Sequence, residues 1–167
     1  MRQATGWVIA GSSVLFLGSA LLWRAQGYAL EWNQTPSLPR GLYSCRAVTK
    51  AAPLPPAVLV TFRLTSAQQA MVPQAGAGLM LKQIWARHPH EVCAQGDEVW
   101  VDGRLEAHRP LQEQLIAGWT GCATLGRQEY FVMGRHPRSV DSRYYGPITR
   151  AQVLEICTPL WTWGGEQ

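Results

Sequence analysis

The stretch DEVWVDGRLE, residues 97–106, carries the clearest structural signal in the sequence. Val99 and Val101 alternate with other side chains, as the inward residues of a strand do, and Asp102-Gly103 follows directly. Asp-Gly pairs favour the tight turns that join antiparallel strands, because both positions tolerate a positive φ. The stretch therefore predicts a β-hairpin.

Short apolar segments extend this pattern on both sides of the hairpin. They are separated by Gly- and Pro-rich stretches, and one short helix is predicted over residues 65–71. Further strands are predicted at residues 41–48, 57–64, 79–86, 129–134 and 152–163. The sequence thus predicts a mainly β domain that is large enough for a real core. A β binding module would show the same pattern, so the fold class alone does not decide the function.

The charge pattern argues against a nucleic-acid-binding surface. Charged residues make up 16% of the chain, and the net charge is +4. Arg residues are scattered among Pro, Gly and Trp, and no segment gathers them into a dense stripe. Such a diffuse surplus is typical of a solvated surface.

An apolar segment over residues 6–23 predicts a membrane helix. It holds 18 residues without a charge, between Arg2 and Arg24, with Trp7 and Trp23 at its ends. As a helix it would be about 27 Å long, close to the thickness of the hydrocarbon layer. The alternative is a cleaved signal peptide, although signal cores are usually shorter. We expect an anchor over residues 1–27 and an exported domain over residues 28–167.

Four cysteines fit the oxidising compartment that export implies. Cys93 and Cys122 flank a hairpin-like stretch, and we expect a disulfide between them. Cys45 and Cys157 are left open, either as a second pair or as buried free thiols. His88, His90 and Cys93 resemble part of a zinc site, but a fourth ligand is missing. We expect no metal and no cofactor.

A serine between two prolines follows the apolar segment, in NQTPSLPRGLY, residues 33–43. Pro36 and Pro39 restrict the backbone on both sides of Ser37, because each ring fixes its own φ and biases the preceding residue toward extended conformations. A stiff linker between anchor and domain explains this pattern. The alternative is a shaped turn that presents a reactive hydroxyl.

Lys82 is the only charge between Arg63 and Arg87. In a strand it would share a face with Met80 and Ile84, because side chains alternate with period two. Burial among apolar neighbours would lower the lysine pKa and leave a neutral amine that can accept a proton. The alternative is the opposite alternation, with the lysine in solvent.

A polar turn follows the strand predicted at residues 129–134. It contains Ser139, Asp141, Ser142 and Arg143. Asp141 and Arg143 are close enough in sequence to pair and to hold this turn rigid. A structural loop with a surface ion pair is the competing interpretation.

Together, the serine turn, the strand lysine and the polar turn resemble the signal peptidase I clan of Ser-Lys proteases. The resemblance is closest to the conjugative-transfer branch, the TraF-type signal peptidases. It covers nearly the whole chain, and its most specific segments are SLPRGLY and SVDSRYYGP. The resemblance implies an antiparallel, signal-peptidase-like β domain behind one transmembrane helix.

The resemblance also implies a role for each residue of the site. Ser37 would be the nucleophile and Lys82 its general base. The Thr35 hydroxyl would complete an oxyanion hole with the Ser37 N–H. Ser139 would orient the lysine amine, and Asp141 with Arg143 would form a supporting ion pair.

The implied function is that of a serine peptidase at the bacterial inner membrane, with its catalytic domain in the periplasm. It would cleave an exported pilin-type precursor during conjugative transfer, and cyclisation of the product is a second outcome. Mating-pair-formation proteins are candidate partners, and no nucleic acid is expected. Two alternatives remain, a general leader peptidase and a non-enzymatic periplasmic assembly or binding subunit. RHPHEVC replaces the Pro-Gly-Asp turn that leader peptidases usually carry after the lysine, which disfavours the first.

Overall fold

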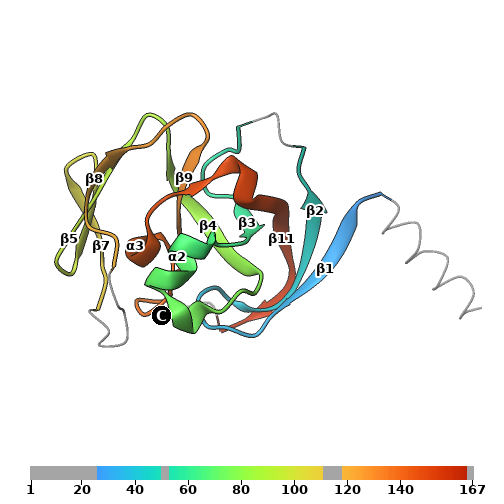
Figure 1. Ribbon diagram of the computed structural model, residues 1–167. Coiled ribbons are helices and arrows are strands. Elements are labelled where there is room, and N and C mark those ends of the chain that lie inside the picture. Colours follow the sequence, from blue (N-terminus) through green and yellow to red (C-terminus); the bar gives the residue numbers. More distant parts are fainter. Residues whose placement is uncertain (1–25, 50–52, 111–117, 165–167) are drawn as a thin grey trace, which may run out of the picture.

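A computed structural model describes residues 26–49, 53–110 and 118–164, which form a mainly β domain with two antiparallel sheets (Figure 1). The larger sheet has the strand order β1-β2-β11-β3-β4-β9-β10, and the smaller one β7-β6-β5-β8. The strands are β1 (Tyr28–Asn33), β2 (Arg40–Ala47), β3 (Leu59–Phe62), β4 (Met80–Arg87), β5 (Glu91–Gln95), β6 (Glu98–Val101), β7 (Arg104–His108), β8 (Gly121–Thr124), β9 (Glu129–Met133), β10 (Ile148–Thr149) and β11 (Val153–Trp163). The helical segments are α2 (Ser66–Met71), α3 (Ser142–Tyr145) and two short 3₁₀ turns, Pro73–Ala75 and Arg150–Gln152.

The hairpin predicted from DEVWVDGRLE is present as β6 and β7. Its turn residues, Asp102 and Gly103, have φ values of 50° and 74°, the conformation for which Asp-Gly pairs are selected. Val99 is fully buried in the core, whereas Val101 is only partly covered. Predicted segments at β2, β3, β4, β9 and β11 are also strands, and Thr65 caps α2 through a capping box.

Several elements differ from the sequence-based expectation. No strand is predicted at β1, because its outward residues Leu30 and Trp32 are apolar and hide the alternation. RHPHEVC, which stands where leader peptidases carry a Pro-Gly-Asp turn, is a turn only in its first part, and β5 begins at Glu91. Ser142–Tyr145 forms a single helical turn in place of an irregular loop, capped by the Asp141 carboxylate.

The core is divided between the two sheets. One cluster lies between the larger sheet and the helices α2 and α3, and is centred on Phe62, Ile84 and Tyr144. A second cluster joins β4 and β9 to the smaller sheet, and includes Val92, Val99, Leu125 and Phe131. The seven-stranded sheet thus has packed neighbours that fix β4, the strand that carries Lys82.

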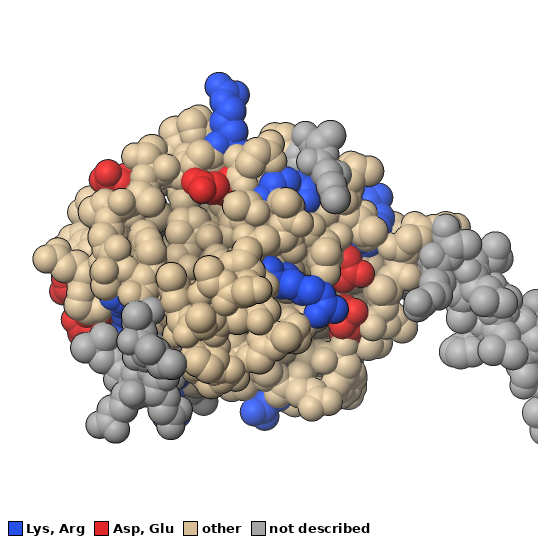
Figure 2. Space-filling view, in the orientation of Figure 1, with Lys and Arg blue, Asp and Glu red and all other residues tan. Residues whose placement is uncertain are grey.

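Charged side chains are dispersed on the face shown in Figure 2. Lys and Arg appear there as separate spots, one of them beside acidic residues, without a continuous basic stripe.

Two disulfides join directly opposed residues on neighbouring strands. Cys93 on β5 is bonded to Cys122 on β8, the pair expected from the sequence. Cys45 on β2 is bonded to Cys157 on β11, so these two residues are not free thiols. The second bridge connects positions 112 residues apart and is buried beside Tyr43.

Loss of the Cys45–Cys157 bridge is expected to cost more stability than loss of the Cys93–Cys122 bridge. The bridges span sequence separations of 112 and 29 residues. In the chain-entropy model the corresponding double Cys→Ser variants lose about 5 and about 4 kcal/mol of unfolding free energy. Urea unfolding of both variants in detergent measures the difference. The reverse order, or free alkylation of the unreduced protein, would contradict it.

Within the residues that the structure describes, no helix has the length and hydropathy needed to cross a bilayer. The anchor predicted over residues 6–23 lies outside those residues.

Candidate active site

The turn that carries Ser37 joins the antiparallel strands β1 and β2. Ser37 is half-buried, and its carbonyl oxygen accepts a hydrogen bond of 2.7 Å from the Arg135 N–H. This bond ties the turn to the segment that follows β9. Sequence-distant parts of the chain thereby meet at the serine.

Asn33, a residue that the sequence analysis does not single out, holds the turn in shape. Its side-chain amide donates hydrogen bonds to the carbonyl oxygens of Thr35 (3.1 Å), Leu38 (3.2 Å) and Pro39 (3.0 Å). Its Oδ1 accepts from the Thr35 N–H (3.2 Å) and hydroxyl (2.9 Å). Pro36 and Pro39 have no N–H to donate, so the amide side chain replaces backbone donors. Asn is common in such turns for this reason, and that preference is the only sequence signal for it.

Lys82 lies on β4 with its side chain directed into the protein. Its exposed fraction is 5%, and the neighbouring Ile84 on the same face is also buried. Burial lowers the lysine pKa from 10.5 to about 8, an effect that nearby Asp141 opposes and nearby Arg143 reinforces. The inward alternation expected from the sequence is therefore the one observed. At pH 7 about a tenth of the amine is therefore unprotonated, far more than for an ordinary lysine.

Gly134 permits the close approach of the serine turn and the polar turn. A Cβ atom at this position would overlap Ser139 Oγ and would lie 2.8 Å from the Ser37 carbonyl oxygen. Any side chain at Gly134 would therefore push these two segments apart. The sequence shows this glycine only as the end of a predicted strand.

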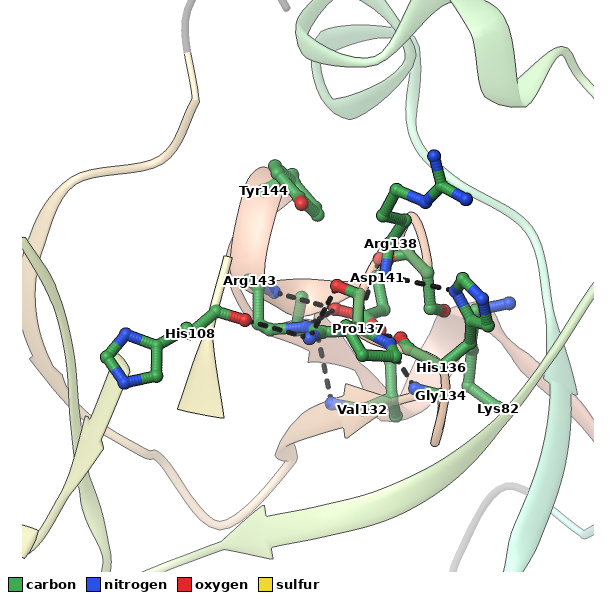
Figure 3. A network of polar contacts seen from close by, with 12 residues as sticks. Lys82, His108, Val132, Gly134, His136, Pro137, Arg138, Asp141, Arg143 and Tyr144 are labelled. Carbon is green, nitrogen blue, oxygen red and sulfur yellow. Dashed lines mark hydrogen bonds and ion pairs between the residues drawn. The ribbon is translucent and has the colours of Figure 1, made fainter. Parts of the chain in front are cut away.

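Asp141 and Arg143 form a fully buried ion pair that organises the polar turn (Figure 3). Arg143 Nε and Nη2 each donate to one carboxylate oxygen of Asp141 at 2.7 Å. The carboxylate also accepts from the Gly134 N–H at 2.8 Å. Further bonds from the guanidinium reach the carbonyl oxygens of His108, His136, Pro137 and Ser139. The ion pair thus holds the segment that carries Ser139 from the interior, and it is not a surface contact.

Asp141→Asn is expected to lower the free energy of unfolding by about 3–5 kcal/mol, because it leaves the Arg143 charge uncompensated in the interior. The Arg143 side chain is only 3% exposed, so solvent cannot replace the lost carboxylate. Thermal or urea unfolding measures this loss. Asp102→Asn, at an exposed carboxylate, is the control and should change stability by well under half as much. Equal losses of stability in the two variants would contradict a stabilising role of the buried Asp141–Arg143 ion pair.

Four of the predicted site residues line one cleft of about 460 Å³. It lies between the serine turn, the start of β4 and the polar turn. Its lining includes Thr35, Ser37, Lys82, His136 and Ser139. Asp141 and Arg143 lie behind this wall, and Figure 3 places Lys82 on the His136 side of their network.

Three contacts implied by the resemblance are not formed in this structure. Lys82 Nζ donates to the carbonyl oxygen of Leu81 at 3.2 Å, and no hydrogen bond joins it to Ser37 among the described residues. Ser139 Oγ is buried without a hydrogen-bond partner in that part of the chain. The Thr35 hydroxyl is engaged by Asn33. Hydrogen bonds of this kind are often long or poorly aligned before substrate is bound.

The cysteine and the two histidines considered for zinc have other partners in the structure. Cys93 is in a disulfide, His88 Nδ1 contacts the Leu125 carbonyl oxygen, and His90 pairs with Asp102 at 2.6 Å. The potential ligand atoms of Cys45, Glu155 and Cys157 lie within 4.8 Å of one another, but both sulfurs are bonded to each other.

Comparison with known proteins places these features in a family context. The family described as "Signal peptidase, peptidase S26" matches residues 4–161. A protein named "Plasmid transfer protein TraF" from Escherichia coli is 33% identical over 97% of each chain. A second protein of that name from Escherichia coli is 31% identical over 92% of each chain. The crystal structure of a signal peptidase I from Enterococcus faecalis V583 superposes with a TM-score of 0.39 at 18% identity, covering 63% of this chain and 97% of that one.

Proposed function

This chain belongs to the peptidase S26 family of signal peptidases, and from that premise we propose that it is a membrane-anchored serine peptidase with Ser37 as nucleophile and Lys82 as general base. The observation that carries the proposal is the shared cleft. Ser37 and Lys82 both line it, and the lysine is buried there with its pKa lowered to about 8. A serine hydroxyl needs a base to become an effective nucleophile, and a neutral lysine supplies one without a histidine.

The proposed reaction proceeds through an ester of Ser37. The neutral Lys82 amine takes the proton of the Ser37 hydroxyl while Oγ attacks the carbonyl carbon of the scissile peptide. The C–N bond then breaks, and the lysine ammonium returns the proton to the leaving amine. Water attacks the ester in the second step, with Lys82 again accepting and returning a proton.

The turn geometry supports an oxyanion site at the serine. The Ser37 N–H donates to no acceptor within the described residues, so it is available to a developing oxyanion. Thr35 would supply the second donor after its hydroxyl rotates away from Asn33. One such donor is typically worth about 3–4 kcal/mol of barrier.

The proposed location is the inner membrane, with residues 1–27 as the anchor and residues 28–167 as the periplasmic domain. The apolar segment ends shortly before β1 begins at Tyr28, which leaves little chain between bilayer and domain. Two disulfides support an oxidising compartment. The catalytic turn directly follows β1, so it would lie near the membrane surface, where exported precursors emerge.

The proposed substrate is a pilin-type precursor in bacterial conjugation, with other transfer proteins as candidate partners. Its support is the likeness to two proteins named for plasmid transfer over nearly their whole length. A general leader peptidase would use the same site on many preproteins. A non-enzymatic assembly subunit would have no need of a buried lysine in the cleft, and this disfavours it.

Processing of a pilin precursor across pH 6–10 tests the proposed function. The purified full-length chain in detergent is incubated with the precursor from a conjugative plasmid, and cleavage is followed by mass spectrometry. The pKa of Lys82 is lowered to about 8, and only the neutral amine accepts a proton. The rate is therefore expected to rise with pH through about 8 and then level off. A rate independent of pH in this range, or no cleavage, would refute the proposal.

The same spectra separate hydrolysis from cyclisation. Attack of water on the Ser37 ester gives a linear product with a free carboxylate, whereas attack by the substrate's own α-amine gives a product lighter by one water. Cyclisation requires that the amine be held close to the ester at high effective concentration.

A further inference from the structure

A second pocket, of about 250 Å³, lies beside the serine turn. We call it the basic pocket, because it contains two arginines and a histidine and no acidic residue. Its lining residues are Pro36, Leu38, Pro39, Arg40, Arg135, His136, Trp163 and Gly164. Pro36 and His136 also line the cleft of Ser37, so the two hollows adjoin.

Both arginines of the basic pocket are fixed close to the nucleophile through the backbone. The Arg135 N–H donates to the Ser37 carbonyl oxygen at 2.7 Å. Arg40 begins β2, only three residues after the serine, and lies opposite Trp163 of β11. The backbone positions of both residues are therefore tied to the serine turn.

Neither arginine has an acidic partner within the described residues, where the ion pairs involve other side chains. Two guanidinium groups that line one pocket, with no acidic partner among the described residues, favour the binding of an anion. A guanidinium matches a carboxylate especially well, because two parallel N–H donors meet its two oxygens.

His136 lines both hollows. Its Nδ1 accepts a hydrogen bond from the Arg138 N–H at 3.1 Å, so in the neutral ring the proton is on Nε2. Trp163 forms an apolar wall that is packed against Trp161 and Trp32, with ring centroids 5.0 and 5.5 Å away. Its ring offers an apolar surface beside Arg40 and Arg135, both of which are exposed.

We propose that the basic pocket is a subsite for a carboxylate of the peptide substrate, held within a few residues of the scissile bond. This inference rests on the proposed function of the Ser37 cleft. A peptide that reaches Ser37 passes the residues shared by both hollows, and an extended chain covers about 3.3 Å per residue. The carboxylate can belong to an Asp or Glu side chain or to the substrate's C-terminus. A lipid phosphate is disfavoured, because the pocket is continuous with the peptide cleft.

Binding measured without turnover tests this subsite. The full-length Ser37→Ala chain in detergent is titrated against fluorescein-labelled, alanine-rich decapeptides, and fluorescence anisotropy gives Kd. One peptide carries a single Glu and its counterpart a Gln, and each is made with a free and with an amidated C-terminus. We expect about fivefold tighter binding of a peptide that presents the carboxylate. A preference for Glu assigns a side chain, and a preference for the free terminus assigns the C-terminus.

Variants of the pocket provide the decisive comparison. The Arg40→Gln/Arg135→Gln double variant is expected to remove the preference. Arg104→Gln, at an 85% exposed side chain on β7, should retain it. Arg135→Glu should shift the preference toward a Lys-containing peptide. Because the readout is binding, loss of this preference and loss of catalysis are separate results.

Two outcomes would overturn the proposal. The first is equal binding of charged and uncharged peptides, including no binding of either. The second is an arginine-dependent affinity for soluble short-chain phosphatidylglycerol over phosphatidylcholine without any peptide preference. That result would assign the pocket to lipid phosphate.

Discussion

Ser37→Ala is expected to lower kcat/KM for precursor cleavage by at least about 10⁴-fold, since no other group in the proposed reaction can form the ester. Stability should be unchanged. The serine hydroxyl makes no hydrogen bond within the described residues, and the turn is held by the Asn33 amide and by the Ser37 carbonyl oxygen. Kinetics on the precursor and thermal unfolding measure the two effects separately.

Ser66→Ala is the matched control for this variant. Ser66 is an exposed serine at the start of α2, away from the lining of the cleft. The Ser66→Ala variant should cleave the precursor at the wild-type rate. Precursor cleavage by Ser37→Ala at that rate would eliminate the proposed nucleophile. Among the described residues that line the cleft, the one other serine is Ser139.

The Asn33 side chain determines the shape of the serine turn, whereas Ser37 provides its proposed chemistry. Five hydrogen bonds converge on this one side chain, and two prolines cannot provide backbone donors in its place. The serine turn thus depends on a residue that contributes nothing to the reaction itself. This explains how a turn at the end of an edge strand can present Ser37 in one position.

Local patterns in the sequence were sufficient for several parts of the structure. The Asp102-Gly103 turn is a property of two residues, and the inward direction of Lys82 follows from strand alternation next to Ile84. The Cys93–Cys122 bridge spans a stretch short enough to suggest the pairing.

Other parts depend on contacts between distant segments and could not be predicted locally. The Cys45–Cys157 bridge joins β2 to β11, which become neighbours only in the complete sheet. Gly134 matters because Ser139 and Ser37 approach it from separate turns. The basic pocket likewise combines Arg40 and Arg135, 95 positions apart, and only the finished fold brings them together. The resemblance suggested roles for Lys82 and Ser139, but their side-chain hydrogen bonds depend on rotamers that a sequence does not encode.

Lys82→Met is expected to abolish cleavage and, at pH 7, to stabilise the fold by about 3 kcal/mol. A lysine with a folded-state pKa of about 8 and an unfolded value of 10.5 is penalised in its charged form, at 1.36 kcal/mol per pKa unit. Methionine fills a similar volume and carries no charge. Lys82→Arg should be inactive too, because a guanidinium stays protonated and cannot act as a base.

The pH dependence of stability distinguishes the penalty for burying a charged lysine from a packing effect of the methionine side chain. Below about 8 the lysine is charged in both states, and the folded protein bears the full penalty. As the pH rises from about 8 toward 10.5, the folded state has lost its proton while the unfolded state still binds one, so wild-type stability increases. The advantage of Lys82→Met should therefore shrink between pH 7 and 9.5 in urea unfolding, whereas Arg104→Met, at an exposed site, should show no such trend. An advantage that stays constant over this range would mean that the lysine is not held in a strained, charged form, and would remove the physical basis for its role as the base.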